Sequence, residues 1–79
     1  MENNAMIISN FASLIAILDP KSLITVWEVT AEGKQKTLYT HIPVYTLYEG
    51  NKHADYKVVG IRTGITTDIL IRKGEVNNA

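Results

Sequence analysis

The chain has no cysteine among its 79 residues, which excludes disulfide bonds, thiolate catalysis and the common cysteine-rich zinc sites. A chain of this length is expected to form one small domain with a modest hydrophobic core. Small domains that lack disulfides often gain stability from a metal or from a partner subunit. The absence of cysteine also fits a reducing compartment, so we expect a cytoplasmic protein.

Net charge and long apolar runs are lacking too. Eight Lys and Arg balance eight Asp and Glu, and a neutral chain is poorly suited to the phosphate neutralisation that drives nucleic-acid binding. The longest apolar run, FASLIAIL, is much shorter than the roughly 20 residues that cross a bilayer. No Lys or Arg precedes Lys21, so we expect neither a secretory signal peptide nor a membrane partner.

Polar ends enclose the part of the sequence that carries a hydrophobic pattern. We predict a flexible leader at residues 1–9, a single α+β domain at residues 10–73 and a flexible tail at residues 74–79. The sequence does not decide whether the opening MENNA is native.

The first patterned segment predicts a short helix over about residues 10–18. Apolar residues spaced at i, i+3, i+4 and i+7 share one helix face, and these are Phe11, Leu14, Ile15 and Leu18. Asn10 is placed to cap the first turn, and Pro20 biases Asp19 away from helical geometry. So short a helix must be held by packing of its apolar face.

The next segment, residues 22–40, predicts a β-hairpin whose register depends on its turn. If Gly33 closes a three-residue loop with a bulge, Thr30 lies opposite Lys34. A two-residue loop would instead pair Ala31 with Lys34 and set Trp27 against Leu38. We favour the bulged register, which also predicts the pairs Glu28–Lys36, Val26–Leu38 and Ile24–Thr40.

The bulged register assigns the side chains of this hairpin to two faces. One face, against the helix, holds Ile24, Val26 and Leu38. The opposite face holds Leu23, Trp27 and Tyr39.

The rest of the domain is predicted as a second hairpin after an ambiguous segment. Residues 43–48 carry strand-forming side chains, but Pro43 at the start and Gly50 beyond the end favour a short helix. Strands are expected at residues 56–63 and 68–73, with an inner face of Val59, Ile61, Ile69 and Ile71. The predicted fold is thus one short N-terminal helix packed on an antiparallel sheet of two β-hairpins, and the strand order is left open.

No recognised catalytic motif occurs, and the five glycines are scattered singly. His53 and Asp55 lie close in sequence, but two ligands on one polar loop do not make a metal site. His41 is expected at a strand end. We therefore expect no enzyme, no metal, no cofactor and no small-molecule substrate.

The surface formed by Leu23, Trp27 and Tyr39 is the strongest functional signal, because tryptophan exposed on a small sheet creates an apolar patch. Either residues 43–48 fold across this surface, or it binds a second copy or another protein. An exposed strand edge is a further way to bind. The sequence thus suggests a homodimer or a protein partner.

Four basic residues on the last two strands support a different function, an accessory protein for single-stranded nucleic acid. They are Lys57, Arg62, Arg72 and Lys73, with exposed aromatics for base stacking. Such charges are also typical of a solvated sheet edge.

The order LIAILDP, ITVWE, EGK, HIPV, YKVVGIR and DILIR resembles a group of very short proteins encoded in phages and other mobile elements of Gram-positive bacteria. The resemblance covers about residues 10–73 and implies a leading helix, a hydrophobic hairpin and a closing strand pair. It implies no activity and no catalytic residues. The segment between Pro43 and Tyr56 is longer here than in that pattern.

Overall fold

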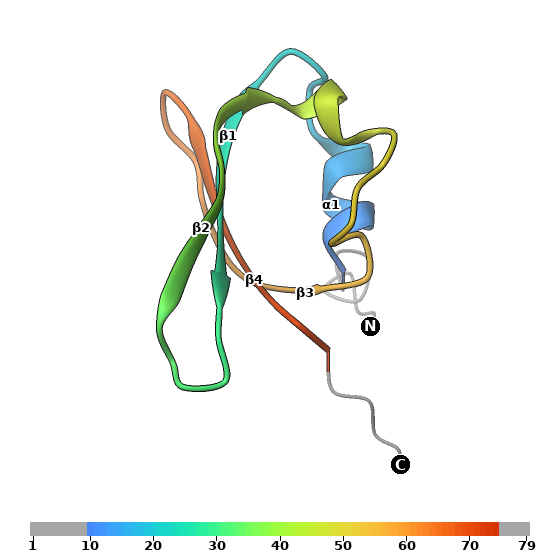
Figure 1. The fold of residues 1–79 in the computed structure, drawn as a ribbon. Helices are drawn as coiled ribbons and strands as arrows, with labels where there is room; N and C mark the ends of the chain where they lie inside the picture. Colours follow the sequence, from blue (N-terminus) through green and yellow to red (C-terminus); the bar gives the residue numbers. More distant parts are fainter. Residues whose placement is uncertain (1–9, 75–79) are drawn as a thin grey trace, which may run out of the picture.

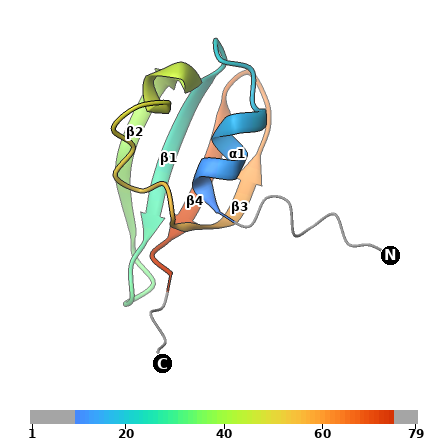
Figure 2. The same cartoon turned by 90° about the vertical axis from the view of Figure 1, so that its right-hand side faces the viewer.

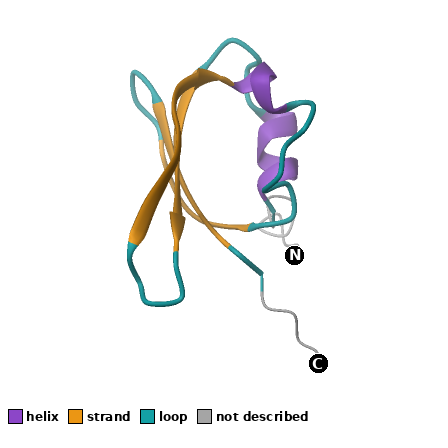
Figure 3. Cartoon of the chain, viewed as in Figure 1, coloured by secondary structure: helices purple, strands orange, loops and turns teal. Residues whose placement is uncertain are grey.

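The computed structural model describes residues 10–74. Its elements are α1 (Phe11–Ile17), β1 (Leu23–Val29), β2 (Gln35–Pro43), the 3-10 helix η2 (Val44–Leu47), β3 (Lys57–Arg62) and β4 (Thr67–Arg72). Both helices lie on the same side of the sheet (Figure 1, Figure 3). The α+β class is confirmed. The predicted leader and all of the predicted tail after Gly74 lie outside the described residues.

Helix α1 begins where the sequence predicts, because its first backbone N–H groups find partners. The side chain of Asn10 accepts a hydrogen bond from Ser13 N at 2.9 Å. Phe11 N donates to the carbonyl of Tyr56 at 2.8 Å, which ties the start of the helix to the segment before β3. The helix of seven residues is therefore fixed at its N-terminus as well as along its buried face.

The four strands lie in the order β2-β1-β4-β3. Strands β1 and β2 pair in antiparallel fashion, as do β3 and β4, so both predicted hairpins are present. The two central strands, β1 and β4, are parallel. The expectation of an antiparallel sheet was therefore wrong at its centre. The chain crosses the helix-bearing face between β2 and β3, and β4 consequently runs in the same direction as β1 (Figure 2).

A single hydrophobic core lies between the sheet and the two helices. Its buried side chains are Phe11, Leu14, Ile15, Ile24, Val26, Val44, Leu47, Ile69 and Ile71. The inner positions predicted for β4 are confirmed. Neither residue predicted for the inner face of β3 is part of the core: Val59 is 50% exposed, and Ile61 is 48% exposed although it lies opposite the buried Ile69. A register shift between Val58 and Gly60 leaves Val58 as the residue of β3 that packs against the core.

The turn of the first hairpin has the predicted bulged geometry. Thr30 N donates to the carbonyl of Lys34 at 2.8 Å, and Glu28 lies opposite Lys36. Gly33 has a φ of 84°, in the left-handed region that glycine adopts readily. The two-residue loop is therefore excluded.

Farther from the turn, two register shifts change the pairing of β2 with β1. Val26 lies opposite Tyr39, not Leu38, and Ile24 lies opposite Ile42, not Thr40. At the second shift, between Val26 and Ile24, His41 takes a φ of 50°. The backbone N–H of His41 donates a hydrogen bond to Oγ1 of Thr25 at 3.2 Å. The first of these shifts, between Trp27 and Val26, places Tyr39 on the same face as the buried Val26, toward the helices.

The 3-10 helix η2 confirms the short helix favoured for residues 43–48. Val44 is fully buried and Leu47 is 6% exposed, and both belong to the core between sheet and helix. Val44 N also donates to the carbonyl of Ser22 at 2.9 Å. Because η2 packs on the same side as α1, the idea that this segment covers Trp27 was wrong.

Candidate protein-binding face

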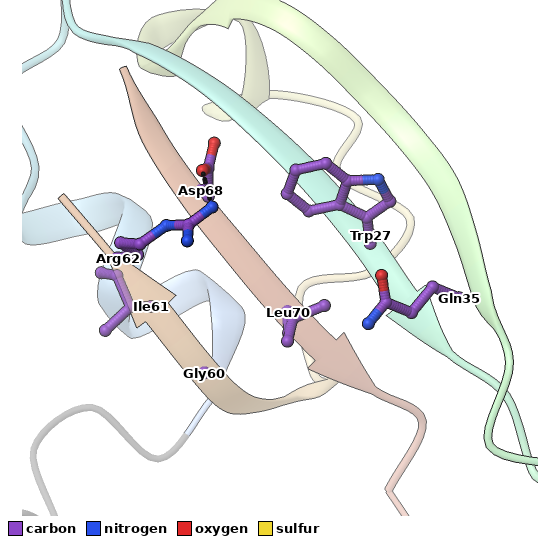
Figure 4. A pocket seen from close by; sticks show the side chains of 7 residues that line it. All are labelled: Trp27, Gln35, Gly60, Ile61, Arg62, Asp68 and Leu70. Carbon is purple, nitrogen blue, oxygen red and sulfur yellow. Dashed lines mark hydrogen bonds and ion pairs between the residues drawn. The ribbon is translucent and has the colours of Figure 1, made fainter. Parts of the chain in front are cut away.

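The sheet face that points away from α1 and η2 is here named the open face. Trp27 of β1 lies opposite Leu70 of β4, and Leu70 lies opposite Gly60 of β3, so the three positions share a face. Their strand neighbours Val26 and Ile69 are fully buried on the other side. The indole and Leu70 therefore look away from the core, as Figure 4 shows.

A shallow depression of about 460 Å³ lies on the open face, and we name it the Trp27 hollow. It spans all four strands and is lined by Trp27, Gln35, Gly60, Ile61, Arg62, Asp68 and Leu70 (Figure 4). Gly60 helps to form it, because a Cβ at this position would lie 3.2 Å from Cδ1 of Leu70. The hollow thus combines an apolar floor with polar groups at its margin.

An ion pair stands at one end of the Trp27 hollow. Nη2 of Arg62 lies 3.1 Å from Oδ2 of Asp68, and the two residues are direct cross-strand partners. The arginine side chain is 83% exposed and the aspartate 27% exposed. So exposed a pair adds little stability, which leaves both groups available to a partner.

The predicted interaction residues fall on different faces. Leu23 and Trp27 are four residues apart on β1 and share the open face, and Leu23 is 42% exposed. Tyr39 was wrongly assigned to this surface, because the bulges of β2 place it opposite the buried Val26. Leu70 and Gly60 belong to the surface instead. The period-two pattern of β4 signals Leu70 once Ile69 and Ile71 are taken as inward.

Three of the four predicted basic residues are gathered at the other end of the β3–β4 pair. Lys57 lies directly opposite Arg72, and both line a depression of about 340 Å³ with Lys73 and Val59. Arg62 is separate from them and is paired with Asp68.

The helix side holds an aromatic cluster that the sequence did not predict. Tyr39 Oη lies 3.1 Å from Nδ1 of His53, and the His53 ring meets those of Tyr39 and Tyr56 edge to face, with centroids 5.8 and 4.8 Å apart. Burial raises the pKa of the Tyr39 phenol above its usual 10.0. The pKa of Tyr56 is raised by burial and, further, by the charges of Glu28 and Asp55.

His53 is thus a packed residue that joins β2 to the segment before β3. Within residues 10–74, no group of three or more His, Cys, Asp or Glu side chains is placed to hold a metal ion. In the same range, no helix has the length and apolar character needed to span a bilayer.

No family model, curated protein or solved structure matches the chain.

Proposed function

We propose that this chain is a non-enzymatic, cytoplasmic interaction protein that binds another protein through the open face. The partner proposed first is a second copy of the same chain, which would give a homodimer. The observation that carries the proposal is the position of Trp27. It lies on the face that neither helix covers, opposite Leu70 and on the same strand face as the 42% exposed Leu23. Tryptophan on such a surface is typical of residues that dominate protein interfaces.

The open face is a better candidate than a strand edge. The edge strands are β2 and β3, and the ladder of each contains at least one register shift. Bulges of this kind twist an edge and hinder the addition of another strand. Asn10 also bridges to Lys57 at the start of β3. Binding through side chains of the open face therefore fits the structure better than β-augmentation.

Sedimentation velocity over a range of concentrations tests the proposal. The average mass should rise with concentration in the wild type and in Ile17→Ala, whose residue is 58% exposed on the helix. Trp27→Ala should stay monomeric. Because Trp27 is the chain's one tryptophan, its emission should also shift to shorter wavelength on association. A wild type that stays monomeric, with emission that does not change with concentration, would refute self-association.

Binding of single-stranded nucleic acid is a second candidate, favoured by the cross-strand pair of Lys57 and Arg72 with Lys73 beside it. Like charges opposite each other are unfavourable unless an anion offsets them. The weakness of this candidate is that Tyr39 packs against the core, so it cannot stack bases beside Trp27.

Heparin retention and binding to a single-stranded oligonucleotide at several salt concentrations test this second function. Affinity should fall steeply with salt and should weaken in Arg62→Ala and Arg72→Ala, whereas Lys21→Ala, before β1, should match the wild type. No retention at low salt would count against it. The resemblance to short phage and mobile-element proteins stays a prediction, and it favours neither of the two candidate functions.

A further inference from the structure

Ile65 is the most exposed large apolar side chain among residues 10–74. It lies in the turn between β3 and β4 and is 105% exposed, whereas Ile17, the next most exposed, reaches 58%. Glycine and polar residues dominate turns, and an isoleucine is not among them. The turn itself therefore gives no reason for an isoleucine here, and its whole side chain is available for contact with another molecule.

The Trp27 hollow begins close to this projecting side chain. Arg62 and Asp68, which stand at the end of the hollow, are each three residues from Ile65. A projecting apolar side chain therefore lies three residues from either side of one end of an apolar depression. Two copies related by a two-fold axis between these positions would each place Ile65 in the hollow of the other.

The charges at the end of the hollow also suit a second copy. A two-fold interface brings the same patch of each chain together, so the patch must be complementary to itself. Arg62 and Asp68 supply one positive and one negative group, 3.1 Å apart, and can exchange partners across such an axis. The zero net charge of the whole chain adds no repulsion between copies.

We propose that a second copy of this chain docks on the open face, with Ile65 of each copy inserted in the Trp27 hollow of the other. This inference rests on the proposed function, and it adds the partner's identity and the contact that fixes its orientation. Gly60 contributes to this contact, because the lack of a side chain at Gly60 leaves Leu70 accessible to Ile65 of the second copy.

Cysteine cross-linking can test the arrangement directly, because the chain has no cysteine of its own. Ile65→Cys and Gln35→Cys are made in separate chains, one with a size tag, then mixed and oxidised. Gln35 lines the hollow, so the disulfide-linked heterodimer should form severalfold faster in this mixture than in a control mixture of Ile17→Cys with Gln35→Cys. Equal rates in the two mixtures would overturn the arrangement.

Sedimentation of a second set of variants separates this inference from the proposed function. Ile65→Ser should weaken dimerisation by about tenfold or more, while Ile17→Ser should leave it unchanged. Both residues are exposed, so neither change disturbs the core. One outcome would refute this docking mode and leave the proposed function standing. In that outcome the wild type dimerises, Trp27→Ala abolishes the dimer, and Ile65→Ser does not weaken it. A wild type that never dimerises refutes both.

Discussion

Tyr39 and His53 are joined by a hydrogen bond of 3.1 Å between Oη and Nδ1, across 14 residues of sequence. The bond links β2 to the segment that crosses the helix side of the sheet. Tyr56 packs edge to face against the same imidazole, with ring centroids 4.8 Å apart. The chain between η2 and β3 is thereby held to the sheet by side chains as well as by its own backbone.

Removal of the Tyr39 hydroxyl should weaken this link without opening the core. We expect Tyr39→Phe to lower the free energy of unfolding by about 0.5–1.5 kcal/mol, the usual net contribution of one hydrogen bond. Urea unfolding near neutral pH measures this. Tyr45→Phe, at a residue that is 55% exposed, is the matched control and should unfold like the wild type. Equal stability of Tyr39→Phe and the control would show that the bond contributes nothing.

The same tyrosines should make the protein sensitive to alkaline pH. The folded-state pKa values of Tyr39 and Tyr56 lie above the usual 10.0, so above that pH the unfolded chain loses phenolic protons that the folded chain retains. The free energy of unfolding should therefore fall as the pH rises from about 10 through the folded-state values. Urea unfolding at several pH values in this range measures the fall. Tyr39→Phe/Tyr56→Phe should flatten it, and an unchanged slope would contradict the assignment.

The N-cap of α1 should contribute measurably to stability. Asn10→Ala removes the side-chain acceptor that lies 2.9 Å from Ser13 N and should cost about 1 kcal/mol in thermal or urea unfolding. Asn10→Asp keeps an oxygen at the same place and should retain most of the stability. If both substitutions cost the same, the cap is not the source of the loss.

The turn glycine should be sensitive to substitution for a purely conformational reason. Gly33 has a φ of 84°, and an added Cβ would meet no atom within 4 Å. Gly33→Ala should thus cost about 1 kcal/mol through backbone strain alone. Gly74→Ala is the control, because Gly74 has equal space and no positive φ. Identical urea midpoints for the two variants would refute the strain argument.

The elements that depend on local chemistry could be predicted from the sequence. The cap at Asn10, the bulge at Gly33 and the short helix after Pro43 each follow from interactions within a few residues. The face of Trp27 followed as well, because β1 pairs with β4 from Ile24 to Glu28 without a register shift.

The features that depend on distant contacts could not be predicted. His41 takes a positive φ without being glycine, and the hydroxyl of Thr25 that supports it lies 16 residues away. No local pattern announces such a bulge. Nor does one announce the shift between Trp27 and Val26, which is why Tyr39 was assigned to the wrong face. The exposure of Val59 has the same origin, a register shift in β3. The parallel pairing of β1 and β4 depends on how the two hairpins associate, which hydrophobic periodicity does not encode.

That parallel pairing has a consequence for biosynthesis. Ile24 of β1 lies opposite Thr67 of β4, so the central ladder joins the first and the last strand of residues 10–74. A nascent chain that ends before Thr67 leaves β1 with one unpaired edge and with Ile24 and Val26 short of their β4 neighbours. Folding of the sheet must therefore wait until β4 has been synthesised, and fragments that stop before β4 should aggregate.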